Sequence, residues 1–134
     1  MHPIHSLRLT PDQDLKTEIQ NFCNQSNISA GCILSAVGSL KIAKLRLAAS
    51  DSFFEAKGKF EIVSVTGTIS KNGSHIHIAL ADETGKVTGG HLTDGNLIYT
   101  TCELVVLNLE TQEFKREHDP ATGFKELEIK LKST

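Results

Sequence analysis

The feature that most constrains the fold is a long alternating pattern interrupted by one turn signal. Residues 59–70 alternate apolar residues with serine and threonine, and residues 74–80 alternate again after Asn72-Gly73. Side chains of a β-strand point in turn to its two faces, and Asn-Gly favours a tight hairpin turn. The pattern predicts an antiparallel hairpin in which a two-residue turn pairs Lys71 with Ser74. Its apolar face would comprise Val63, Val65, Ile69, Ile76, Ile78 and Leu80.

Only one segment of the sequence has a clear helical pattern. Thr10-Pro11-Asp12-Gln13 has the order of an N-cap, a first-turn proline and a capping-box glutamine. Leu15, Ile19, Phe22 and Cys23 then recur at helical spacing, which gives one apolar stripe suited to packing on a core. The polar segment 24–27 should end this helix.

The rest of the chain has the character of β-strands. Further candidate strands span 6–9, 33–47, 86–92 and 97–109, with a half-exposed closing strand at 126–132 and a charged loop at 112–123. The sequence therefore predicts a single α+β domain over residues 1–134, mainly antiparallel sheet with one principal helix packed on it.

Charge and cysteine usage exclude several classes of protein. The net charge is −2 with the histidines neutral, which argues against a strongly basic nucleic-acid binder. Cys23, Cys32 and Cys102 are odd in number and form no Cys-x-x-Cys pair, so reduced cysteines in a cytoplasmic protein are expected. Neither a signal peptide nor an apolar run of about 20 residues is visible, so no membrane association is expected.

Three histidines are the strongest candidates for chemistry. His75 and His77 stand at i and i+2, so on a strand they share one face, opposite Ile76 and Ile78. His91 on the next strand could supply a third imidazole. Three imidazoles suit zinc or another divalent transition metal, with a coordination position left for water or a ligand.

The third histidine joins the cluster only in one register. A four-residue loop after Ala81 would place His77 opposite Gly90 and turn His91 to the wrong side. An odd loop, or one bulged residue at Gly89-Gly90, would bring His91 to the histidine face. We predict such a correction, and we interpret Gly89-Gly90 as a bulge.

Charged residues outside the histidine cluster have two possible roles. In a regular strand, Glu61 would fall on the apolar side, where a carboxylate needs a partner such as Arg8. Glu103 is treated in the same way. We favour stabilising ion pairs for these residues. In the alternative, functional interpretation, Glu61 or Glu103 would be a general base near a metal-bound water, or Arg8 would bind an anionic ligand.

Several segments together resemble a known family. Residues 58–68, Gly-Lys-Phe-Glu-Ile-Val-Ser-Val-Thr-Gly-Thr, resemble the central motif of the plant and prokaryote conserved (PPC) domain. The segments 75–77 and 85–92 resemble the next stretch of the domain in prokaryotic members, and 7–9, 37–40 and 101–104 also fit. The likeness extends over about residues 5–131.

The resemblance implies a PPC-like α+β domain assembled as a homotrimer, of a kind whose stand-alone prokaryotic members have no defined biochemical role. In plants the domain comes after an AT-hook, a basic segment that binds DNA. This sequence has no Arg-Gly-Arg-Pro hook, which weakens DNA binding, and it has the three histidines, which strengthens the metal interpretation.

Three functions remain open from the sequence. The first is a metal-binding trimeric module that holds a small molecule or a protein partner. The second is a metal-dependent enzyme acting on a small molecule, and the third is a DNA-associated regulator. The first ranks highest because no residue is an unambiguous general base for the second.

Overall fold

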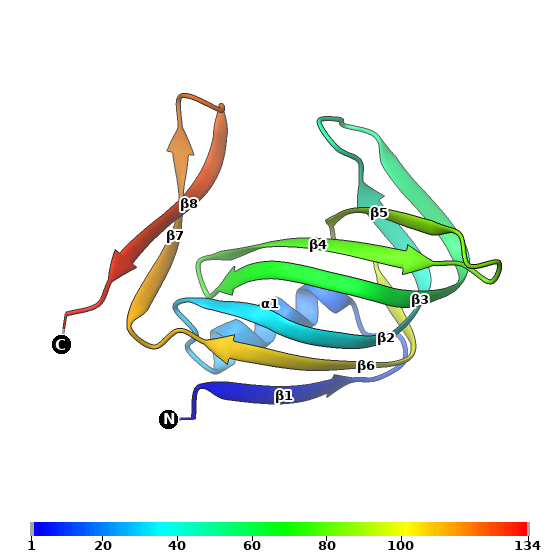
Figure 1. Cartoon of the computed structure of the whole chain (residues 1–134), viewed down its shortest axis with the longest axis horizontal. Coiled ribbons are helices and arrows are strands. Elements are labelled where there is room, and N and C mark those ends of the chain that lie inside the picture. Colours follow the sequence, from blue (N-terminus) through cyan, green and yellow to red (C-terminus); the bar gives the residue numbers. More distant parts are fainter. Residues whose placement is uncertain (1, 134) are drawn as a thin grey trace.

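An antiparallel β-sheet forms the body of the computed structural model, which describes residues 2–133 (Figure 1). The elements are β1 (Ile4–Leu9), α1 (Leu15–Gln25), β2 (Gly31–Arg46), β3 (Phe53–Ser70), β4 (Gly73–Ala81), β5 (Val87–Leu92), β6 (Leu97–Asn108), β7 (Gln112–Asp119) and β8 (Phe124–Leu131). The predicted class, a mainly antiparallel sheet with one helix, is confirmed.

The main sheet has the strand order β1-β6-β2-β3-β4-β5, and its last strand, β5, also pairs with β2. The last residues of β2 pair with β5 as well as with β3, through Leu45↔Leu92 and Arg46↔His91. Strands β2 to β5 therefore form a closed ring, and β5 has a hydrogen-bonded neighbour on both sides.

Helix α1 packs on one face of the sheet and contributes Leu15, Ile19 and Cys23 to the core (Figure 1). It begins later than predicted. Gln13 does accept a hydrogen bond from the Thr10 backbone amide at 2.8 Å, but Asp12 adopts a φ of +74°, which a helix does not allow. Asp14 is the true N-cap, since its carboxylate accepts from the backbone amide of Thr17 at 3.2 Å.

The β3–β4 hairpin has the predicted faces in a different register. Ser70 pairs with Gly73, so the turn is Lys71-Asn72 and not Asn72-Gly73. The Ser70 hydroxyl bonds within the turn, and the Asn72 side chain donates to the carbonyl of Phe114 at 2.9 Å. The register differs by two residues, an even number, so no side chain changes face.

A β-bulge in β3 corrects two further predictions. The register shifts between Ile62 and Ser64, which leaves Val63 as an extra residue and reverses the alternation before it. Val63 is 56% exposed and not part of the core, while Ile62 is buried. Glu61 is exposed, not on the apolar side, so no buried carboxylate needs a partner there.

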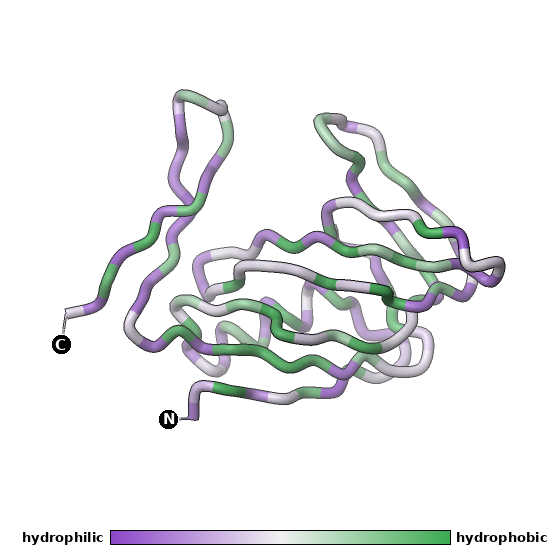
Figure 2. Tube along the Cα trace, viewed as in Figure 1, coloured by the Kyte–Doolittle hydropathy of each residue, from purple (hydrophilic) through white to green (hydrophobic). Residues whose placement is uncertain are grey.

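The C-terminal segment forms a separate hairpin. Residues 112–119, predicted as a loop, are strand β7, and β8 pairs with β7 alone. The hairpin projects from the main sheet, which it contacts through Phe114 and Arg116, and it carries apolar positions along its length (Figures 1 and 2). Phe124, Ile129 and Leu131 are all more than half exposed. Within residues 2–133, no helix has the length and apolar character needed to cross a membrane.

Candidate metal centre

Strands β4 and β5 of the ring place His77 and His91 directly opposite each other. β4 and β5 pair from His77↔His91 to Ala81↔Val87, so the loop between them has five residues, 82–86. The Asp82 carboxylate holds this loop, since it accepts from the backbone amides of Thr84 and Lys86 at 2.8 and 3.0 Å. The predicted register correction is confirmed, and it comes from the odd loop.

The predicted bulge at Gly89-Gly90 is wrong, because β5 pairs regularly with β4 through both glycines. They are needed for close approach. A Cβ atom on Gly90 would lie 2.7 Å from the carbonyl oxygen of Arg46 on β2, and one on Gly89 would lie 2.9 Å from the carbonyl oxygen of Ile78. Both distances are too short for a side chain, so glycine permits the closure of the ring.

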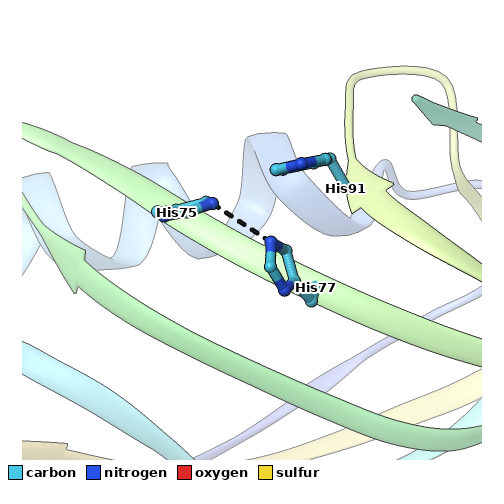
Figure 3. Close-up of side chains that lie close together, drawn as sticks. All are labelled: His75, His77 and His91. Atoms are coloured by element: carbon cyan, nitrogen blue, oxygen red, sulfur yellow. Dashed lines mark hydrogen bonds between the residues drawn. The ribbon is translucent and has the colours of Figure 1, made fainter. Parts of the chain in front are cut away.

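The three imidazoles converge on one face of β4 and β5 (Figure 3). The Nε2 atoms of His75 and His77 lie 3.1 Å apart, and one candidate ligand nitrogen from each histidine lies within 4.8 Å of the others. The His91 ring stacks parallel to His75, with centroids 5.3 Å apart, while His77 is almost perpendicular to both. A tetrahedral zinc ion with bonds of about 2.0 Å needs its nitrogens about 3.3 Å apart. Small side-chain adjustments would meet that requirement.

The surroundings of His75 and His91 favour the neutral imidazole, which is the form that binds metals. Desolvation lowers the pKa of His75, and the charges of His77 and Arg116 lower it further, against an opposing effect of Glu126. Desolvation also lowers the pKa of His91, followed by the charge of Arg46.

A pocket of about 390 Å³ adjoins the cluster and contains residues that sequence reasoning did not assign to the site. Arg46 comes from β2, and Arg116 and Glu126 come from the β7–β8 hairpin. The sequence pattern predicts a strand over 33–47 and a loop at 112–123, so neither points to this pocket. Arg116 is held at the site by a 2.8 Å hydrogen bond to Thr68, the residue opposite His75.

The remaining sequence candidates lie elsewhere. Arg8 on β1 and Glu103 on β6 are paired residues, linked through the Thr101 hydroxyl, which accepts from Arg8 at 3.0 Å and donates to Glu103 at 3.4 Å. Glu61 lies opposite Ala81 on β4. None of the three lines either pocket beside the histidines.

Comparison with known proteins agrees with this architecture. The family model of the Plants and Prokaryotes Conserved domain, the PPC domain of the sequence resemblance, matches residues 2–110. This chain belongs to that family. The predicted membership is confirmed, and the matched range of the PPC domain ends before β7, so Arg116 and Glu126 lie beyond it.

Individual relatives of this PPC-domain protein include proteins of several kinds. The chain is 45% identical over 126 residues to the bifunctional protein GlmU of Synechococcus sp. (strain JA-3-3Ab), with 94% of this chain and 20% of that protein covered. It thus spans about a fifth of the length of that curated relative. A hypothetical protein from Salmonella cholerae-suis is 33% identical, with a TM-score of 0.94 and coverage of 97% and 94%. A metal-containing protein from Archaeoglobus fulgidus is 30% identical, with a TM-score of 0.81 and coverage of 93% and 92%.

Proposed function

We propose that this protein is a metal-binding PPC-domain module in which His75, His77 and His91 hold zinc or a similar divalent transition metal. The convergence of three imidazole nitrogens within 4.8 Å carries the proposal. Neutral imidazoles on a rigid sheet suit zinc, and three protein ligands leave one position open. The likeness to a metal-containing protein from Archaeoglobus fulgidus supports the same interpretation.

The proposal includes a homotrimer. The surface of the main sheet carries exposed apolar residues, among them Leu34, Val37 and Val63, each more than half exposed. A free two-stranded hairpin is marginally stable in water, and β7–β8 exposes its own apolar residues. Burial of both against other copies would stabilise the chain. Light scattering should give three times the chain mass of 14.6 kDa.

We also propose a cytoplasmic location. Cys23, Cys32 and Cys102 are all unpaired, as expected where thiols stay reduced.

Metal content tests the central proposal. Elemental analysis of protein supplied with zinc and then desalted should give about one ion per chain. His77→Ala should lose most of it and still fold, because the side chain is exposed. His2→Ala is the matched control, since His2 is exposed and outside the cluster. A protein that stays metal-free, or equal metal in both variants, would refute the site.

A metal-dependent enzyme is the second candidate, and Glu126 favours it. Its carboxylate lines the same pocket as His75 and His91, where it could accept a proton from a metal-bound water. Hydrolysis of p-nitrophenyl phosphate by the zinc-loaded protein would support this function. Glu126→Gln should then lose the activity and retain zinc. If the zinc-loaded wild type does not hydrolyse this substrate, the metal-binding module is favoured over the enzyme.

A further inference from the structure

The pocket beside the histidines has an excess of positive charge. Arg46, Arg116 and Lys125 line it against a single carboxylate, Glu126. The two arginines reach it from different parts of the fold, the end of β2 and the β7 strand. Their convergence is therefore a product of the tertiary structure and not of a basic run in the sequence.

Neither guanidinium is neutralised. Arg116 donates to the Thr68 hydroxyl at 2.8 Å, and Arg46 donates to the Ser50 carbonyl at 3.4 Å. Both partners are uncharged, and neither arginine forms an ion pair within residues 2–133. Both side chains are half-buried, where an unpaired charge is costly and an anion is the natural partner.

We infer that this pocket binds a small ligand through a carboxylate or phosphate group, held by Arg46 and Arg116. Guanidinium groups bind both kinds of oxyanion through paired hydrogen bonds. Contact between that ligand and a metal at the histidines rests on the proposed function, whereas the anion pocket stands on the two arginines. DNA also carries phosphates, but a pocket of about 390 Å³ and a net charge of −2 favour a small molecule.

Calorimetry tests the inference. The metal-free protein, in whatever oligomeric state it purifies, is titrated with inorganic phosphate and separately with succinate. At least one should bind, and the preference identifies the oxyanion. Arg46→Gln and Arg116→Gln should each weaken binding by about tenfold or more, as expected for charge-assisted hydrogen bonds. Arg8→Gln is the matched control and should bind like the wild type, because Arg8 lies outside the pocket.

Thermal unfolding shows which variants are folded. If Arg46→Gln does not fold, Arg46→Lys replaces it, and weaker anion binding than in the wild type is still expected. Binding of neither anion, or binding unaffected by the arginine variants, would overturn the inference. So would arginine-dependent binding of a 20-base-pair duplex without binding of phosphate or succinate. Zinc uptake is measured on separate portions of the same preparations, after zinc is supplied and the protein is desalted. Zinc uptake without anion binding refutes only this inference, and anion binding without zinc uptake refutes only the metal proposal.

Discussion

His77 faces His91 across the β4–β5 ladder, with ring centroids 4.5 Å apart. Directly opposed residues of an antiparallel pair have the closest side chains in a sheet. This pairing brings the third imidazole into the cluster, and it depends on the odd length of the loop at 82–86.

Removal of that third imidazole should greatly weaken zinc binding. Loss of an outer partner of a metal ligand typically lowers affinity 10- to 100-fold, so loss of a ligand should lower it by more than about 100-fold. We expect this of His91→Ala in competition with a chromophoric chelator. His118→Ala is the control. The His118 side chain is exposed on β7, so this variant should retain the zinc affinity of the wild type. An unchanged affinity for His91→Ala would mean that His75 and His77 suffice.

The closing glycine should tolerate no side chain. In Gly90→Ala the new methyl group would meet the Arg46 carbonyl at 2.7 Å, so β5 must move away from β2. We expect a loss of about 1–3 kcal/mol in urea denaturation, the usual cost of overpacking, together with weaker zinc binding. Gly58→Ala is the control, since its nearest contact is an ordinary 3.5 Å from the Phe60 ring. Equal stability of the two variants would contradict the role given to Gly90.

The metal-free protein should lose stability as the pH falls below about 6.5, the ordinary pKa of histidine. The folded-state pKa values of His75 and His91 are lowered, so the unfolded chain takes up protons first. Their contribution to stability is complete above pH 6.5 and is lost between that pH and the lowered values. We expect urea denaturation at pH 7.5 and 5.5 to show a larger loss for the wild type than for a His75→Gln/His91→Gln double variant. The opposite order would mean that the folded protein favours the charged imidazoles.

Native thiol labelling should be selective for Cys32. Burial raises the pKa of Cys23 to about 11, and burial with the nearby Glu103 charge raises that of Cys102 to about 12. Thiols react as thiolates, so both should resist iodoacetamide at pH 8. Cys32 is only half-buried and lines the second pocket beside His75 and His77. Mass spectrometry should find one modified cysteine per chain, and equal labelling of all three would contradict this arrangement.

Local alternation was enough to predict the histidine face. The hairpin register at Lys71-Asn72 differed from expectation, but a shift of two residues keeps every side chain on its face. The same alternation limited the possible positions of His91, because only an odd loop or a bulge could bring it to the face of His77. The hydrophobic period was readable from the sequence, whereas the choice between an odd loop and a bulge was decided only by the structure.

Non-local contacts were not readable in this way. The bulge at Val63 reversed the alternation around Glu61, and nothing in the local residue types marks it. Arg46 reaches the site only because β2 pairs with β5, and Arg116 only because 112–119 forms a strand beside Thr68. Such positions depend on long-range packing, which outweighs local propensity.

The pairing of β5 with strands on both sides has a consequence for how an ion would be captured. The backbone that carries His91 is anchored before any ion arrives, as is that of His75 and His77. Coordination would then immobilise three rings without ordering a loop, so its entropic cost is small. Empty and loaded protein should share one backbone, and loading should need no slow conformational step.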